Sequence, residues 1–299
     1  MNDPAARPRA ARATPPSERR VSPGWDRFRR NRLAVGGAVF LAVLALACTA
    51  APLLTRYSPV AMTLDQPYRP PGVAHPLGTD TLGRDVWSRI VFGGRFDLGL
   101  SVLAVLLATS GGVCIGLVSG YAGGALDDAL MRIVDVLLAI PDLLLALALV
   151  AFIGPSLTSV VLILAFSRMP RYARLVRGSV LGLKKLEFVT AATVLGASRA
   201  RILVRHLVPN LTGPISVYST LDLGGVIAAL AGLSFVGVGI QPPAAEWGLM
   251  LTDARQNLVL APWTAVFPGL AITLCIIAFN FVGDGARDAL DPRTRRRTR

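Results

Sequence analysis

The chain is divided into long apolar blocks, each of about 20 residues or more, that contain almost no charged side chains. The uncharged blocks span 33–54, 98–126, 143–167 and 263–282, and a further block at 215–240 holds one acidic residue, Asp222. About 20 apolar residues in a helix cross the ~30 Å hydrocarbon core of a bilayer. The pattern therefore predicts a polytopic helical membrane protein.

The block at 143–167 must be divided, because Gly154-Pro155-Ser156 interrupts it. Proline suits a turn or the first position of a helix. We therefore predict one helix over 133–153 and a shorter helix from Ser156 onward. Irregular backbone is not tolerated against lipid, so this break is expected near the interface or against protein. The expected fold class is an all-α membrane protein with six transmembrane helices.

The positive charges agree with six spans. If the N-terminus is cytoplasmic and the spans alternate, 25 of the 31 Lys and Arg residues fall on the cytoplasmic side, as the positive-inside rule predicts. The net charge of +13 is thereby explained by membrane orientation, and nucleic acid binding is not expected. We predict a multi-pass protein of a bacterial cytoplasmic (inner) membrane with both termini in the cytoplasm.

Five segments follow from this arrangement. Residues 1–32 form a basic cytoplasmic N-terminus, rich in Arg, Pro and Ala, that is expected to be disordered. An uncleaved first transmembrane helix at 33–54 and an extracytoplasmic segment at 55–97 follow. The transmembrane core is expected at 98–283, with a cytoplasmic loop at 168–210, and a basic cytoplasmic tail at 284–299.

The cytoplasmic loop at 168–210 is long and basic. It contains two amphipathic pieces, which we expect to form short helices that hinge at Gly196 and stop at Pro209. A loop that only connected two spans would not need this organisation. We therefore predict that it docks a cytoplasmic partner.

Charged residues of both signs are paired near the end of the extracytoplasmic segment, at Asp80, Arg84, Asp85 and Arg89. Two nearby glycines favour a tight turn that leads into an interfacial helix. Asp85 and Arg89 are four residues apart and would share a helix face. These residues belong either to a salt-bridged surface helix or to a contact with an external partner.

Three residues in the spans are candidates for translocation or gating. Pro141 is expected to kink the helix over 133–153, either as a packing device or as a gating hinge. Asp222 is an ionisable group within a span, which indicates a function unless it lies near the cytoplasmic interface. Ser234 lies near the end of the same block. Asp222 is the one acidic residue that the pattern places inside the membrane.

The sequence shows no catalytic constellation. His75 and His206 are expected on opposite sides of the membrane, and Ser234 has no nearby base, which disfavours a membrane-embedded enzyme. The three cysteines lie in apolar blocks without metal-ligand spacing. A Gly-x-x-x-x-Gly-Lys-Ser/Thr phosphate loop is also missing. We expect a non-catalytic chain without a metal or cofactor, so that any ATP would be hydrolysed by another polypeptide.

Motifs along nearly the whole chain resemble, in order, the permease subunits of bacterial ABC importers for peptides and nickel. The matching stretches are 29–34, 75–89, 131–141, 171–177, 187–210, 233–235, 241–243, 247–248, 261–263, 268–269 and 283–293. The similarity is greatest to the second, C-type permease of the dipeptide/oligopeptide branch. The resemblance implies a MetI-like fold with its permease core at 98–283.

In that family the cytoplasmic loop carries the EAA motif, whose short helix docks on an ATPase subunit. Thr190 stands where the family usually has an acid, and Glu187 lies one helical turn earlier. Leu207 matches the motif as well. The resemblance assigns ATPase coupling to Glu187, Thr190, Ala191, Ala192, Gly196, Ile202 and Pro209.

The resemblance implies a subunit that moves di- or oligopeptides across the membrane by alternating access. Its partners would be a homologous second permease, two ATPase subunits that bind ATP and Mg²⁺, an extracytoplasmic substrate-binding protein and the lipid bilayer. Nickel or another small solute is the alternative cargo. A stand-alone secondary transporter is the rival class, and it would require paired intramembrane charges or inverted repeats.

Overall fold

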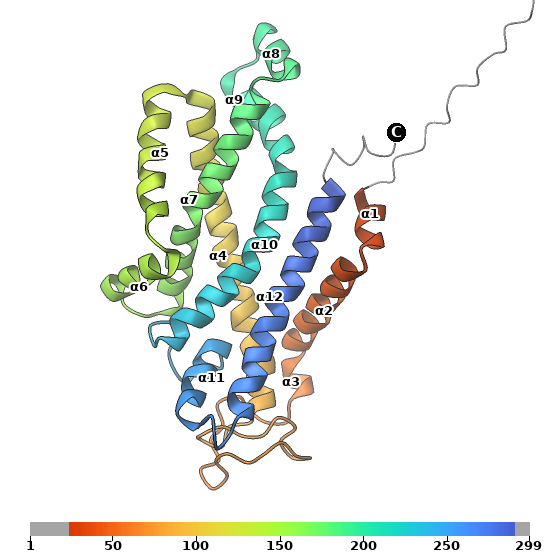
Figure 1. Ribbon diagram of the computed structural model, residues 1–299, viewed down its shortest axis with the longest axis vertical. Helices are drawn as coiled ribbons and strands as arrows, with labels where there is room; N and C mark the ends of the chain where they lie inside the picture. The colour runs from red at the N-terminus through yellow and green to blue at the C-terminus, as the bar shows by residue number, and fades with distance from the viewer. Residues whose placement is uncertain (1–23, 291–299) are drawn as a thin grey trace, which may run out of the picture.

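The computed structural model describes residues 24–290, and these form an elongated bundle of helices (Figure 1). No β-strand occurs in this part of the chain. The helices in chain order are α1 (Gly24–Arg30), α2 (Arg32–Thr49), α3 (Ala51–Leu54), α4 (Val86–Ala122), α5 (Gly124–Ala139), α6 (Asp142–Ile153), α7 (Leu157–Leu183), α8 (Glu187–Val194), α9 (Arg199–Ile202), the π-helical turn η1 (Leu203–Leu207), α10 (Val208–Phe235), α11 (Trp247–Ala254), the 3-10 turn η2 (Arg255–Asn257) and α12 (Trp263–Leu290). Most of the predicted N-terminal segment and of the basic tail lies outside the described residues.

The all-α architecture is confirmed. Helix length and apolarity alone, however, do not identify all six predicted transmembrane spans. Four helical runs in residues 24–290 are long and apolar enough to cross a membrane, namely α2, α4, α12 and the continuous run Arg199–Phe235. A fifth is added if α5 and α6 count as one broken span. The helix α7 has 27 residues, but it carries four arginines, from Arg168 to Arg177. The six predicted spans therefore include one helix that is too charged to be recognised by apolarity alone.

The helix α7 begins as the sequence predicts and ends later. Ser156 is its N-cap, with reciprocal bonds to Ser159 that satisfy free backbone groups of the first turn. The helix then continues to Leu183, so it is not the short helix that was expected. Residues 168–183, which were predicted to begin the cytoplasmic loop, are helical.

The helix α4 also exceeds its prediction. It starts at Val86, inside the segment 55–97 that was expected outside the membrane, and runs for 37 residues, or about 55 Å. Asp85 caps it by accepting a hydrogen bond from the Ser88 backbone at 2.8 Å. The first span likewise differs from 33–54, because α2 ends at Thr49 and the single turn α3 follows.

Pro141 breaks the predicted helix over 133–153 instead of kinking it. The two pieces, α5 and α6, are bent by 94° relative to each other. Ile140 and Pro141 both take extended backbone conformations, with ψ of 128° and 132°. Proline disfavours a helical conformation at the preceding residue and donates no backbone hydrogen bond, which favours a break here, although α7 continues through Pro170.

The helices α4 and α7 pack closely along glycines spaced four residues apart: Gly112, Gly116 and Gly120. A Cβ atom on Gly116 would lie 2.6 Å from the Ala173 carbonyl oxygen. Small residues let membrane helices approach in this way. The pair α4/α7 thereby forms the centre of the bundle, with α8 beyond one end and α11 at the other (Figure 1).

Candidate functional site

The segment after α7 forms one end of the molecule (Figure 1). We call Lys184–Leu207 the coupling segment, and it contains α8, α9 and η1. Its inner face belongs to an apolar cluster with the ends of α7 and α10, made of Val176, Val180, Val189, Ala192, Ile202, Leu207 and Leu211. This packing fixes α8 on the bundle without help from another chain.

The outer face of α8 is open. Glu187, Thr190 and Ala191 are exposed and line a surface depression of about 550 Å³, together with Lys185, Val194 and Leu195. The side chains of Val194 and Leu195 are 81% and 86% exposed. Exposed apolar side chains beside small residues are typical of a surface that another protein covers.

The structure divides the seven predicted coupling residues. Glu187, Thr190 and Ala191 lie on the open face, whereas Ala192 and Ile202 are buried in the supporting cluster. The turn predicted at Gly196 is confirmed, because its φ of +79° is a conformation that favours glycine. The Gly196 backbone NH donates to the Thr193 carbonyl at 3.0 Å and ends the α8 turn.

The prediction that Pro209 stops a helix is wrong. Pro209 lies in the first turn of α10, and the helical run continues from Arg199 to Phe235. Pro209 comes just after the π-helical turn η1, where the Val208 backbone NH donates to the Leu203 carbonyl, so the regular bonding pattern that a proline interrupts is already altered there. The turn η1 therefore joins α9 to α10 directly.

Asp222 lies in the middle of α10, 14 residues after its first residue. Its carboxylate accepts hydrogen bonds from Arg168 Nη1 at 2.7 Å and from the Tyr172 hydroxyl at 3.1 Å. Arg168 also donates to the Gly225 carbonyl at 2.8 Å. All three side chains that meet here are buried.

A second acid extends this group. Asp142, in the first turn of α6, lies 2.5 Å from Arg171 Nη1 and 3.6 Å from Arg168 Nε. We call Asp142, Arg168, Arg171, Tyr172 and Asp222 the central network. It joins α6, α7 and α10, and its two acids and two arginines balance in charge.

Sequence reasoning missed four of these five residues because it placed Arg168 and Arg171 in the cytoplasmic loop. The spacing of Arg168 and Tyr172, four apart, was the available signal that both lie on one helix face. Of the three gating candidates, Pro141 and Asp222 are brought together through Asp142 and Arg168. Ser234 is not, since its hydroxyl accepts from the Ile240 backbone at 3.2 Å and closes the turn after α10.

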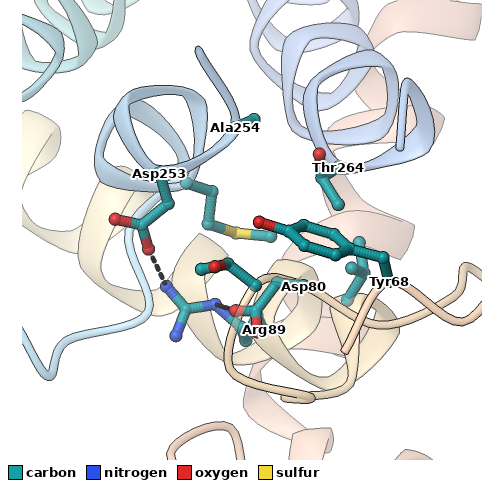
Figure 2. A pocket seen from close by; sticks show the side chains of 9 residues that line it. Tyr68, Asp80, Arg89, Asp253, Ala254 and Thr264 are labelled. Atoms are coloured by element: carbon teal, nitrogen blue, oxygen red, sulfur yellow. Dashed lines mark ion pairs between the residues drawn. The ribbon is translucent and has the colours of Figure 1, made fainter. Parts of the chain in front are cut away.

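The four charged residues predicted at the extracytoplasmic end are buried, with side chains turned toward one another. Asp80 accepts from Arg84 Nε at 2.6 Å, and Arg84 Nη2 donates to Asp253 of α11 at 2.7 Å. Figure 2 shows Arg89 between Asp80 and Asp253, at 3.6 Å from each. We call Asp80, Arg84, Arg89 and Asp253 the outer cluster.

The geometry of the outer cluster shows that the predicted salt-bridged surface helix is wrong. Asp85 does not pair with Arg89, because its carboxylate caps α4 and accepts from His75 Nδ1 at 2.9 Å. The residues Asp80, Arg84, Asp85 and Arg89 each expose at most 6% of their surface. The prediction that they contact an external partner therefore has no exposed side chain to support it in this structure.

The membrane part contains an acid that the sequence placed outside. Asp97 lies within α4, is fully buried, and accepts from the Trp247 backbone at 3.2 Å. Beside it, Glu246 caps α11 by accepting from the Gly248 and Leu249 backbones. Asp222 is thus not the one buried acid of the bundle.

Other ion pairs hold the second half of α7 against α5. Arg177 donates to both carboxylate oxygens of Asp127 in α5, at 2.7 and 2.8 Å. Asp135 pairs with Arg174 of α7, not with Arg132 on its own helix. In residues 24–290, no group of three His, Cys, Asp or Glu side chains is arranged to hold a metal ion.

Comparisons with known proteins agree with this architecture. Residues 112–296 match the family described as binding-protein-dependent transport system inner membrane component. Residues 22–71 match the N-terminal transmembrane domain of oligopeptide transport permease C.

Two curated relatives cover nearly the whole chain. The dipeptide transport system permease protein DppC of Alkalihalophilus pseudofirmus is 42% identical over 91% of each chain. The glutathione transport system permease protein GsiD of Pectobacterium atrosepticum is 43% identical over 90% of each chain.

A solved structure of the MetNI methionine ABC transporter, in inward-facing conformations, shares the fold at a TM-score of 0.54 and 18% identity. The match covers 68% of this chain and 97% of that one, so the predicted MetI-like fold is confirmed. On this evidence the chain belongs to the family of binding-protein-dependent transport system inner membrane components, the membrane permeases of ABC importers.

Proposed function

We propose that this chain is the permease subunit of an ATP-driven importer that moves di- or oligopeptides across the cytoplasmic membrane by alternating access. The peptide cargo is supported by relatives named as dipeptide and glutathione permeases, each above 40% identity over at least 90% of this chain. The observation that carries the coupling role is the open outer face of α8 on an otherwise packed coupling segment.

The open face of α8 is the docking site for an ATPase subunit. Thr190 and Ala191 keep its centre flat, and Glu187 lines the same depression one turn earlier. An acid is therefore present on the docking surface although Thr190 replaces the acid usual in the motif. The buried residues Ala192 and Ile202 act by holding α8 in place, not by touching the partner.

The complete importer contains a homologous second permease, two ATPases and an extracytoplasmic binding protein. ATP and Mg²⁺ bind to the ATPases, and this chain acts without a cofactor of its own. In this arrangement both termini are cytoplasmic, since α1 and the last turn of α12 lie toward the end of the bundle where α8 lies (Figure 1). ATP transmits motion only if the docked ATPases fit one state of the permeases better than the other.

A stand-alone secondary transporter is the second candidate, because the central network supplies the paired intramembrane charges that such a protein requires. However, the positive and negative charges of the central network neutralise one another, and the network links three helices of this one chain. A nickel or other small-solute importer would share the whole architecture and differ in the binding protein.

Reconstitution separates these candidates. The chain is purified with the ATPases, second permease and binding protein encoded beside it, and labelled peptide uptake into proteoliposomes is measured. We expect uptake only with ATP and with every subunit present. Uptake by this chain alone, driven by an ion gradient, would refute the importer. Uptake of nickel but not of peptide would show that nickel is the cargo, and the protein would still be the permease of an ATP-driven importer.

A further inference from the structure

The central network is buried at one end and exposed at the other. The side chains of Asp222 and Arg168 are 5% and 10% exposed, whereas those of Asp142 and Arg171 are 19% and 38% exposed. Arg168 is also held by the Gly225 carbonyl. The inner pair is thus a fixed support, and the outer pair, Asp142 with Arg171, reaches the surface of the chain.

The exposed Arg171 of this pair lies midway along the long helix α7. Arg171 is 14 residues into α7, about 21 Å from the first residue, and the helix continues for another 12 residues. Asp222, which marks the other side of the network, is likewise central in α10. The outer pair therefore lies far from both ends of the bundle.

Lipid is an unsuitable neighbour for this pair. Charged side chains in the middle of a membrane-spanning helix are costly against lipid, and they face protein or water instead. The outer pair is flanked by Tyr218, whose ring packs edge-on against Tyr172 at 4.9 Å. Nearer the start of α7 and on α4, exposed side chains such as Leu162 and Leu106 are apolar.

We propose that Asp142 and Arg171 face the water-filled translocation path and contact the charged ends of the passing peptide. The idea rests on the proposed function and names the part of the chain that meets the cargo. Arg171 presents a guanidinium to a peptide carboxylate, and Asp142 presents a carboxylate to a peptide ammonium group. The buried pair Arg168–Asp222 positions both and does not need to open.

Water accessibility tests this assignment directly. Single cysteines replace Asp142 or Arg171 in a Cys114→Ser background, because Cys114 is exposed while Cys48 and Cys275 are buried. The control positions are Leu106→Cys and Leu162→Cys, both exposed and apolar. The complete importer in proteoliposomes is treated with a charged, water-soluble methanethiosulfonate reagent.

We expect the cysteines at 142 and 171 to react at least about tenfold faster than the two controls, because only a thiolate in contact with water reacts. A transportable dipeptide with free termini should slow labelling at both positions, and the same peptide with blocked termini should slow it less. Labelling at 142 and 171 as slow as at the controls would overturn the proposal. So would labelling that neither peptide changes.

The charge-conserving variants Arg171→Lys and Asp142→Glu keep the proposal testable if a cysteine variant fails to assemble. We expect them to retain more peptide uptake than Arg171→Gln and Asp142→Asn, and equal uptake in all four would contradict the role. Labelling can be measured whether or not peptide is the cargo. Failure of ATP-dependent uptake by the unmodified importer would therefore refute the proposed function, independently of the labelling result.

Discussion

Single side chains decide what the open face of α8 can accept. Ala191 lies on the depression and is exposed, while Ala192 beside it is buried in the cluster that supports α8. Neighbouring alanines thus have different roles, one at the expected interface and the other in the scaffold. Substitutions that are identical in chemistry should consequently give different defects.

Ala191→Arg should abolish ATPase docking while leaving the permease folded, because a long charged side chain fills the flat centre of the depression. Disruption at an interface centre typically costs ~2 kcal/mol or more, which is over tenfold in affinity. The measurement is co-purification of the ATPase with the permease, with Ala200→Arg on the exposed face of α9 as the control. Normal co-purification of the Ala191 variant would contradict the docking assignment.

The buried pair Arg168–Asp222 gives a prediction at the same scale. Arg168→Leu leaves Asp222 with Tyr172 as its remaining side-chain partner, and breaking a buried ion pair costs about 3–5 kcal/mol. The double variant Arg168→Leu with Asp222→Leu should be more stable than either single variant, since it leaves neither charge alone. Thermal unfolding in detergent measures this, and a double variant as unstable as the sum of the singles would argue against the pairing.

At the scale of elements, α4 and α7 form a pair whose distance is set by glycine. The backbone of Ala173 occupies the space where a side chain on Gly116 would begin. Gly99, on the same helix, has nothing within 4 Å of such a position. The two glycines form a matched pair for testing the packing.

Gly116→Ala should destabilise the bundle by about 1–3 kcal/mol through overpacking. Gly99→Ala should be neutral or stabilising by up to ~1 kcal/mol, because alanine is the better helix former. Melting temperatures of the purified variants compare them. Equal melting temperatures would mean that α4 and α7 are not held at this distance.

For the whole molecule, the outer cluster fastens three distant parts of the chain together. Asp80 and Arg84 belong to the segment between α3 and α4, Arg89 lies in the first turn of α4, and Asp253 comes from α11. Arg84 and Asp253 are 169 residues apart in sequence. The cluster therefore closes the end of the bundle that is opposite α8 (Figure 1).

Asp253→Asn should loosen the segment 55–85 from α11, because Arg84 and Arg89 would then share Asp80 alone. Losing a partner of a buried group costs about 1–3 kcal/mol. Hydrogen exchange in 55–85 should quicken, while Asp65→Asn, an exposed acid of the same segment, should change little. Unchanged exchange in the Asp253 variant would show that the cluster does not hold this end closed.

Much of the site was predictable where the signal is local. The turn at Gly196 and the helix start at Ser156 follow from residue types that favour those conformations. The interpretation failed at Pro209 and at Arg168, because a local pattern does not show that a helix continues through a proline in its first turn or through a row of arginines. At both positions, packing against neighbouring helices determines that the helix continues, and the local sequence does not.

The sequence by itself determined the class of the molecule: apolar blocks long enough to span a bilayer, basic segments between them and a family-specific coupling loop. These properties depend on residues close together in the chain. Only the tertiary structure decided which charges meet, because Arg168 and Asp222 are 54 residues apart and become partners when α7 packs on α10. The low dielectric of the packed bundle makes such pairing obligatory, but nothing in the local sequence specifies the partner.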